Sequence, residues 1–335
     1  MSSRPSVTLY TASAEGHRGE YTRVLSSALS CRFSCRSTRS LLELMSPRLT
    51  SVFFEMLDDR APSFLVLALI RSLLGLRTSG LFFRSGECFR PGLKYKIKQA
   101  LFRALRLLPG VTVLTILPFQ IDPRFALVAH GWIYDPQLWD LPILTEEKRE
   151  NRIAEFNIRE PAAGRKVIVA LGGQERIKGF EFFCQIWLGS AELRERYMFA
   201  VAGRIPPGYG ELLSRFEEAG GLAFNSFVTE DELRHAYAQA DAVWCCYAPD
   251  YDQSSGIFGR SFQLGVPAIV REGSYVQQLS SLLDHDQVAL TFGEVDLSVA
   301  VLLRSEFERA DQVEIQKKVE ALRDVSLANL ERSIA

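Results

Sequence analysis

From Lys166 onward, short apolar runs alternate with amphipathic stretches, and this alternation constrains the fold more than any other feature of the sequence. Strand-like runs separated by helix-like segments are typical of a parallel sheet whose strands are joined by crossover helices. The runs that we interpret as strands are 166–171, 198–202, 222–227, 242–247, 267–270 and 288–292. The pattern therefore predicts an α/β domain with helices packed on its sheet.

The length of the chain leaves room for a second domain. Its 335 residues match two α/β domains of about 150 residues each better than one ordinary core. The first half is less regular, and its plausible strands are 7–11, 81–84, 111–117 and 126–129. The stretch 141–165 carries prolines and a charged run, as passages between domains do. We predict domains at 1–150 and 151–335, the second ending in an amphipathic helix.

Composition argues against several classes of function. Lys and Arg (39) nearly balance Asp and Glu (40), so no net charge attracts the chain to nucleic acid. The six cysteines lack zinc-ligand spacing and are typical of reduced cytoplasmic thiols. We see no secretory signal, and no apolar segment reaches the roughly 20 residues that span a bilayer. We expect a cytoplasmic protein with no nucleic-acid partner and no transmembrane segment.

The loop after strand 166–171 is a candidate anion site. Gly172 and Gly173 let the backbone approach an anion, and Lys178 supplies a positive charge. In doubly wound sheets, ligands bind at the carboxyl ends of the strands, where backbone N–H groups point outward. A diphosphate would suit this loop. The alternative is a plain strand-to-helix turn with a solvated lysine.

Two further loops at the same edge have suitable composition. Ser254, Ser255 and Gly256 open a helix, and Arg260 lies further along it, so this segment can bind phosphate, ribose or sugar. The alternative is a capped helix with a surface arginine. At the end of strand 198–202, Gly203 is followed by Arg204, which either contacts phosphate or is solvated.

These loops, taken in order, resemble the C-terminal domain of glycosyltransferase family 4. The matching segments are Gly172, 178–179, 199–203, 227–233, 240–241, 256–259 and 265–267. The stretch 254–257 is also similar to the nucleotide-binding loop of UDP-N-acetylglucosamine 2-epimerases, which share the architecture. Both relatives bind nucleotide-diphosphate sugars. The resemblance implies the GT-B fold, in which two Rossmann-like α/β domains face a central cleft.

The resemblance also implies an activity and a site. The enzyme would be a glycosyltransferase of the hexosyltransferase type, retaining, and independent of metal and cofactor, since its donor is a nucleotide-diphosphate sugar. Lys178 and Arg260 would stabilise the departing diphosphate. Donor-binding residues would be Gly172, Gly173, Lys178, Gly203, Arg204, Val228, Asp252, Ser254, Ser255 and Gly256.

The first half resembles the family only loosely. Gly16 matches the glycine that faces the donor phosphates, and His17 would serve the acceptor or the leaving group. A solvated loop histidine is the alternative. His130 occupies the place of the family's Asn near the end of the last strand of this half, so we expect it to face the cleft.

Three positions depart from the family pattern. The family's two glutamates, eight residues apart, correspond to Asp252 and Arg260, and its diphosphate arginine corresponds to Gly173. A catalytically degenerate GT-B protein that binds a nucleotide or a partner, or an epimerase-like enzyme, is therefore an alternative function. Asp250 and Asp252 also spell the Asp-x-Asp that holds a metal in other glycosyltransferases, which we interpret as coincidental.

The acceptor is predicted to be a glycan, a glycolipid or another lipid-linked molecule, as in polysaccharide biosynthesis. Residues 92–108 read as a basic amphipathic helix, which can lie on an anionic membrane. The protein would then be peripheral at the inner membrane face. The alternative is a helix packed on the sheet with its lysines in water.

Overall fold

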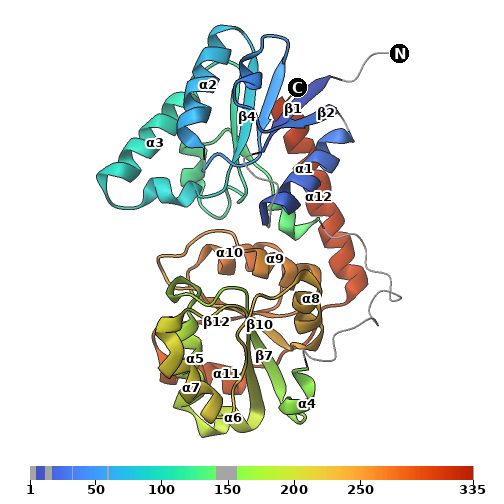
Figure 1. The fold of residues 1–335 in the computed structure, drawn as a ribbon. Helices are drawn as coiled ribbons and strands as arrows, with labels where there is room; N and C mark the ends of the chain where they lie inside the picture. The colour runs from blue at the N-terminus through green and yellow to red at the C-terminus, as the bar shows by residue number, and fades with distance from the viewer. Residues whose placement is uncertain (1–4, 12–16, 32, 59, 141–156, 335) are drawn as a thin grey trace. The chain divides into compact units, whose positions relative to one another are not determined.

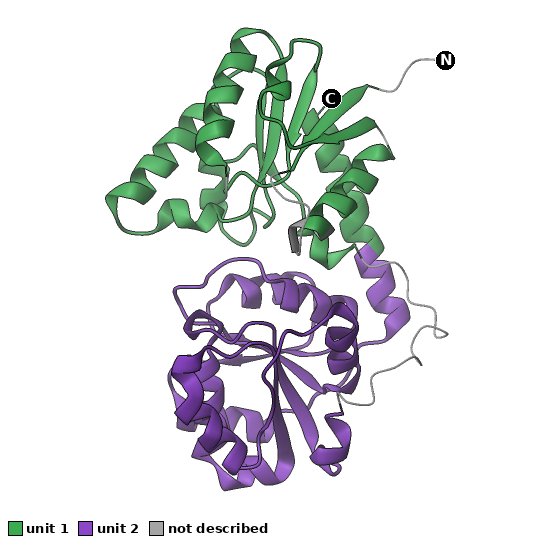
Figure 2. Cartoon of the chain, viewed as in Figure 1, with its two compact units in different colours: residues 1–140, 320–335 green, residues 141–319 purple. Residues whose placement is uncertain are grey.

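The computed structural model describes residues 5–11, 17–31, 33–58, 60–140 and 157–334. Contacts divide the chain into two compact units, Met1–Asp140 with Glu320–Ala335 and Leu141–Val319 (Figure 2). Each unit contains one parallel sheet of six strands, so the predicted α/β class with two parallel-sheet domains is confirmed. The boundary predicted near residue 150 lies outside the described residues. The end of the last helix belongs to the first unit.

The first unit has the strand order β2-β1-β3-β4-β5-β6. Its strands are β1 (Ser6–Tyr10), β2 (Ser34–Thr38), β3 (Ser51–Phe54), β4 (Arg77–Phe82), β5 (Val111–Thr115) and β6 (Gly131–Trp132). The prediction of a strand at 126–129 is wrong. That segment is the end of a 3-10 helix, η3 (Pro123–Leu127), because the Asp122 side chain accepts a hydrogen bond from the Arg124 N–H and starts a helical turn instead.

Helices cover both faces of this sheet. On one face, α2 (Ala61–Leu73) and α3 (Leu93–Leu105) bury Phe64 and Phe102 against the strands. On the other face, α1 (His17–Ser30) and the end of α12 (Gln312–Ile334) pack against β1, where Leu330 is buried. The Ser79 hydroxyl donates to the Ser333 carbonyl at 3.0 Å, satisfying one of the carbonyls that a helix end leaves without an intrahelical donor.

Arg71 of α2 ties the amino ends of this sheet together. The side chain is fully buried, and its Nε donates to the Thr78 hydroxyl at 3.0 Å. The guanidinium also donates to the carbonyl oxygens of Leu44 at 2.9 Å, Leu49 at 2.7 Å and Arg77 at 2.9 Å. Burial lowers the pKa of Arg71 to about 10. These acceptors compensate the cost of removing the cation from water.

The second unit has the strand order β12-β11-β10-β7-β8-β9. Its strands are β7 (Lys166–Leu171), β8 (Tyr197–Ala202), β9 (Leu222–Phe224), β10 (Ala242–Cys245), β11 (Ala268–Arg271) and β12 (Gln287–Leu290). This is the doubly wound Rossmann order, in which β7 and β10 are adjacent and the chain changes direction between them. The strands predicted from the sequence in this half are all confirmed, with shorter ends at β9, β10 and β12.

Helices join these strands in the expected alternation (Figure 1). They are α4 (Arg159–Ala162), α5 (Phe180–Gly189), α6 (Ala191–Arg196), α7 (Gly210–Glu218), α8 (Glu230–Gln239), α9 (Gly256–Gln263), α10 (Tyr275–Leu282) and α11 (Val295–Arg304). α8 begins with a capping box, in which the side chains of Thr229 and Glu232 each accept from the other's backbone N–H. None of the helices that the structure describes has the length and apolarity needed to cross a bilayer.

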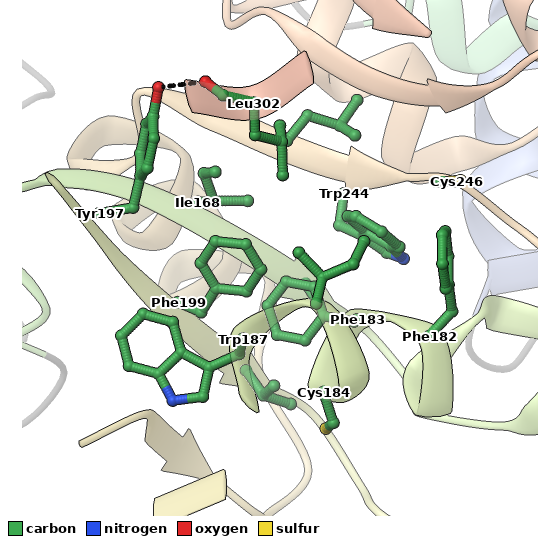
Figure 3. Packing of buried hydrophobic residues seen from close by; sticks show 14 of the residues in the cluster. Ile168, Phe182, Phe183, Cys184, Trp187, Tyr197, Phe199, Trp244, Cys246 and Leu302 are labelled. Atoms are coloured by element: carbon green, nitrogen blue, oxygen red, sulfur yellow. Dashed lines mark hydrogen bonds between the residues drawn. The ribbon is translucent and has the colours of Figure 1, made fainter. Parts of the chain in front are cut away.

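Aromatic side chains fill the core on the α5 side of the second sheet (Figure 3). The ring of Phe183 lies 4.7 Å from that of Phe199 and 5.2 Å from that of Trp244, and Trp187 stacks on Phe199 at 5.3 Å. Buried aromatic pairs contribute both area and specific geometry to a core. They hold α5 rigidly, and the loop before α5 is the one that carries Lys178.

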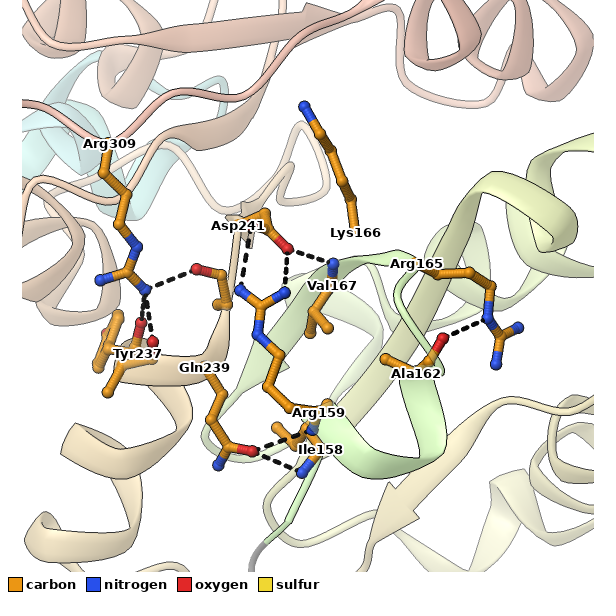
Figure 4. A network of polar contacts seen from close by, with 12 residues as sticks. Ile158, Arg159, Ala162, Arg165, Lys166, Val167, Tyr237, Gln239, Asp241 and Arg309 are labelled. Carbon is orange, nitrogen blue, oxygen red and sulfur yellow. Dashed lines mark hydrogen bonds and ion pairs between the residues drawn. The ribbon is translucent and has the colours of Figure 1, made fainter.

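A polar network lies at the amino-terminal ends of the strands of this sheet, opposite the ends that the Lys178 loop follows (Figure 4). The Asp241 carboxylate accepts from the Val167 N–H at 2.7 Å and from the Arg159 guanidinium at 2.8 Å. The Gln239 side-chain oxygen accepts from the backbone N–H groups of Ile158 at 2.7 Å and Arg159 at 3.1 Å. With its amino ends fixed in this way, the β7–β10 pair presents its carboxyl ends, and the loops that follow them, in a defined register.

Candidate functional site

The candidate site lies where the sheet of the second unit changes direction. β7 and β10 are paired in parallel, so the loops that follow them leave the same edge of the sheet side by side. The crevice between such loops is where doubly wound sheets bind ligands. A pocket opens at this end of the sheet, lined among others by Arg176, Gly179, Ala248, Pro249 and Phe292, and its described lining includes none of Lys178, Tyr247 and Ser255.

Two glycines let the loops after β7 and β8 touch backbone to backbone. A Cβ at Gly203 would lie 1.8 Å from the carbonyl oxygen of Gly172, and φ at Gly203 is 148°. Gly172 itself has φ of 81°, which L residues rarely adopt. A Cβ at Gly173 would meet nothing within 4 Å, so the backbone there borders open space. The Gln174 N–H donates to the Arg204 carbonyl at 2.8 Å and locks the two loops together.

Lys178 is held by two tyrosines from the loop after β10. Its ammonium donates to the Tyr251 hydroxyl at 2.9 Å. It also lies 4.0 Å from the centroid of the Tyr251 ring and 4.4 Å from that of Tyr247. Cations over ring faces are attracted by the ring quadrupole. The Lys178 side chain is half-buried, so its ammonium is held at the carboxyl ends of the strands and does not extend freely into solvent.

Tyr247 connects this lysine to the start of α9. Its hydroxyl lies 2.7 Å from the Ser255 hydroxyl, and Ser255 caps α9 by accepting from the Phe258 N–H at 3.4 Å. Burial raises the pKa of Tyr247 well above its usual value, which keeps the phenol neutral. The structure therefore brings the predicted residues Lys178 and Ser255 to one place, with Ser254 and Gly256 beside Ser255. A helix N-terminus and a cation together form a favourable site for an anion.

The two aspartates of the Asp-x-Asp pattern each have a cationic partner. Asp250 pairs with Arg176. Asp252 accepts from the N–H of Tyr275, the first residue of α10, at 2.8 Å, and lies 3.3 Å from the guanidinium of Arg271. Among the described residues, no three His, Cys, Asp or Glu side chains gather where they could hold a metal. In this arrangement, Asp252 links the loop after β10 to the start of α10.

Arg260 is not the surface side chain that the capped-helix alternative describes. It is only 8% exposed. Its guanidinium donates to the Gln263 side-chain oxygen at 3.2 Å, and its Nε lies 3.8 Å from the carboxylate of Glu230. Glu230 is the first residue of α8, so these contacts direct the guanidinium toward that helix. A phosphate-binding role for Arg260 stays a prediction.

The remaining predicted residues are less closely grouped. Arg204 is exposed, with its guanidinium 5.6 Å from the centroid of the Phe227 ring, and Val228 is half-buried just before α8. Gly16 lies outside the described residues, and of His17 the structure describes only the backbone, which begins α1. The Nδ1 of His130 accepts from the Val113 N–H at 3.0 Å, which extends the sheet pairing at the start of β6. This contact uses His130 as a structural acceptor.

Sequence reasoning missed the tyrosines and Arg271. Tyr247 is the last residue of the predicted strand 242–247, and Tyr251 lies between Asp250 and Asp252, so neither position indicates a contact with Lys178. The Nε of Arg271 donates to the Tyr247 carbonyl at 3.1 Å. Together with its contact to Asp252, this bond fixes the loop after β10 from the side of β11. The sequence signal for Arg271 is its position at the end of β11, the strand that pairs with β10, which places a cation beside the loop after β10.

Comparison with known proteins supports the fold. No protein-family model and no curated protein sequence matches the chain. A glycosyltransferase from Rickettsia africae is similar over 99% of this chain and 98% of its own, with a TM-score of 0.60 and 12% identity. A UDP-forming α,α-trehalose-phosphate synthase from Burkholderia xenovorans covers 99% of this chain and 100% of its own, with a TM-score of 0.59 and 13% identity.

A third solved structure is that of Anabaena HepE in complex with UDP. It is similar over 98% of this chain and 95% of its own, with a TM-score of 0.58 and 10% identity. These neighbours are GT-B glycosyltransferases, and the two six-stranded parallel sheets of the present chain match that fold. At identities this low, the structural similarity shows the fold alone. The chemistry has to be inferred from the residues at the carboxyl ends of the strands.

Proposed function

We propose that this protein transfers a glycosyl group from a nucleotide-diphosphate sugar to an acceptor, and that the second unit binds the donor. The observation that carries the proposal is the convergence of Lys178, Tyr247 and Ser255 at the carboxyl edge, where the sheet changes direction. A positive charge beside a helix N-terminus suits the diphosphate of such a donor. The backbone around Gly172 and Gly173 supplies the close approach that phosphate oxygens require.

The proposed chemistry places the main demand on the leaving group. The bond between the anomeric carbon and the diphosphate oxygen breaks, and the diphosphate takes the electron pair. The acceptor oxygen bonds to the anomeric carbon, and its proton passes to the departing diphosphate. Lys178 and the N–H groups at the start of α9 would stabilise the developing negative charge. Retention at the anomeric carbon is what the resemblance to family 4 implies, and this scheme uses no metal.

Further support comes from the solved structures that share the fold. HepE has been solved with UDP alone and with UDP and glucose, and one of the other neighbours is named as UDP-forming. A uridine nucleotide is therefore the first donor class to test. In the first unit, we propose that Gly16 faces the donor phosphates and that His17 serves the acceptor or the leaving group. The acceptor is expected to be a glycan or lipid-linked molecule, handled in the cytoplasm during polysaccharide synthesis.

A second candidate function is a degenerate GT-B protein that binds a nucleotide sugar without turnover. The observation that favours it is the buried Arg260, paired with Glu230 and Gln263, in the place where family 4 has a glutamate. A guanidinium only donates hydrogen bonds, so it cannot accept them from ribose hydroxyls as a carboxylate does. Binding with no transfer would favour this candidate over the first.

Calorimetric titration with UDP, GDP and ADP tests the proposed site. In the Lys178→Ala variant, affinity for the preferred diphosphate should fall by about 10-fold to 100-fold, because a charged hydrogen bond contributes roughly 1.5 to 3 kcal/mol. Lys166→Ala is the matched control, since Lys166 begins the same strand, β7, and pairs with Glu306 at 2.8 Å at the other edge. Equal affinities in the two variants would exclude the assigned diphosphate site.

A further inference from the structure

The helix α2 of the first unit presents an uncharged apolar face to solvent. Its outer side carries large exposed side chains: Val66 60%, Leu69 48%, Leu73 81% and, just after the helix, Leu74 57%. The only charged residue of the helix, Arg71, is buried in the protein. Surface helices of soluble domains ordinarily place charged and polar groups on this side. A contiguous apolar face of this kind marks a contact surface.

The neighbouring helix α3 adds a second apolar stripe with basic residues beside it. Leu93, Ile97 and Leu101 follow one another at intervals of four residues, so they share one side of the helix, and they are 74%, 51% and 43% exposed. The exposed basic residues of this segment are Lys94, Lys96, Arg103 and Arg106. No Asp or Glu occurs within residues 92–108. The four exposed cations therefore have no acidic residue within their own segment.

Lys98, another basic residue of α3, forms ion pairs within the unit. The Lys98 ammonium lies 2.9 Å from the Glu87 carboxylate and 3.5 Å from that of Asp58, on the side that packs toward the sheet. Lys98 thus anchors α3 to the unit. The anchored helix presents the remaining cations and the leucine–isoleucine stripe outward in a fixed arrangement.

Both helices cover the same face of the first sheet, where their inner residues share one core cluster (Figure 1). We infer that this α2–α3 face binds the surface of an anionic lipid bilayer. The α2–α3 face consists of Val66, Leu69, Leu73, Leu74, Leu93, Ile97 and Leu101 with Lys94, Lys96, Arg103 and Arg106. The apolar side chains enter the boundary between headgroups and acyl chains, and the basic ones pair with lipid phosphates.

Charge complementarity selects this occupant over a second copy of the chain. A two-fold pairing through the same face would bring the basic residues of one copy against those of the other. An anionic bilayer neutralises them instead. The inference deepens the proposed function, because it places a lipid-linked acceptor within reach of the first unit; for that step it rests on the proposed transfer, whereas binding to the bilayer does not.

Sedimentation with vesicles tests the α2–α3 face on the full chain. One set contains phosphatidylcholine alone and the other an equal mixture of phosphatidylcholine and phosphatidylglycerol. We expect binding to the mixed vesicles that weakens with added salt. Lys96→Gln/Arg103→Gln should weaken it roughly 30-fold, about fivefold for each charge removed. Leu69→Gln/Leu73→Gln on α2 should weaken it to a similar extent or more.

Leu297→Gln on α11 of the second unit is the matched control, because Leu297 is 52% exposed and lies outside the face; it should bind like the parent. UDP titration of each variant separates the two claims, since these substitutions should leave nucleotide affinity unchanged. Absence of vesicle binding by the parent chain would overturn the inference, whatever the nucleotide result. So would equal binding by all variants, or a parent dimer that the α2 variant dissociates without any effect of lipid.

Discussion

His285 should make the stability of the second unit depend on pH. The ring is 5% exposed and lies edge-on to Phe258 and Phe262 of α9, at 5.7 and 5.6 Å between ring centroids. Burial lowers the pKa of His285 from 6.5 to about 4, Lys318 lowers it further, and the Val266 backbone opposes this shift. Protonation therefore opposes the packing that supports the helix whose N-terminus forms the candidate site.

The sign follows from the depressed pKa of a base. Above the unfolded value near 6.5, both states are neutral and the stability is complete. As the pH falls, the unfolded state binds the proton first, so stability is lost until the folded value near 4 is passed. Between pH 7.5 and pH 4.5 the loss from this group alone is about 2.5 kcal/mol, from about 1.36 kcal/mol per unit of pKa difference.

His285→Phe removes this titration while keeping an aromatic ring in the same place. Hydrogen exchange of peptides that cover α9, followed at both pH values in urea, measures the local free energy of unfolding in parent and variant. The free energy of unfolding of the variant minus that of the parent should be about 2.5 kcal/mol larger at pH 4.5 than at pH 7.5. A difference that stays constant across this range would refute the reasoning, because all other titrating groups are shared.

Three further substitutions have expected outcomes in urea denaturation. Arg71→Met keeps the length of the side chain but leaves buried carbonyls without a donor, so it should cost the first unit about 3 kcal/mol or more; a cost under about 1 kcal/mol would contradict the network. Gly203→Ala should cost about 3 kcal/mol and weaken nucleotide binding, because the new Cβ would meet the Gly172 carbonyl; parent-like affinity would show that the loop contact is dispensable. Thr229→Ala should cost about 1 kcal/mol through loss of the capping box with Glu232, and no change would show that α8 starts without it.

The second unit could be predicted from sequence because its strands are short, apolar and separated by clear helix signals. The Thr229 cap and the strand before Gly172 are local patterns, and local patterns survive in the folded chain. The first unit was harder because β2 (Ser34–Thr38) is polar and lies at the sheet edge, so no apolar run marked it. The strand prediction at 126–129 was wrong because a short apolar run resembles a strand, although this run ends a 3-10 helix that starts at Pro123.

The site could be predicted in part. The loops with Lys178 and Ser255 were found because parallel strands deliver their carboxyl ends to one edge. The role of Tyr247 between them depends on side-chain direction at the end of β10, which composition does not record. The burial of Arg260 depends on α8 packing beside α9, a tertiary contact between segments that carry no common sequence signal.

Hydrogen exchange with and without UDP tests the central claim most directly, because it locates the nucleotide without assuming any residue's role. We expect slower exchange at the backbone N–H groups of 172–174 and 254–257 in the second unit when UDP is bound, with little change at the amino-terminal ends of the strands near Asp241. Protection confined to the Asp241 edge, or to the first unit alone, would contradict a donor site at the carboxyl ends of β7 and β10.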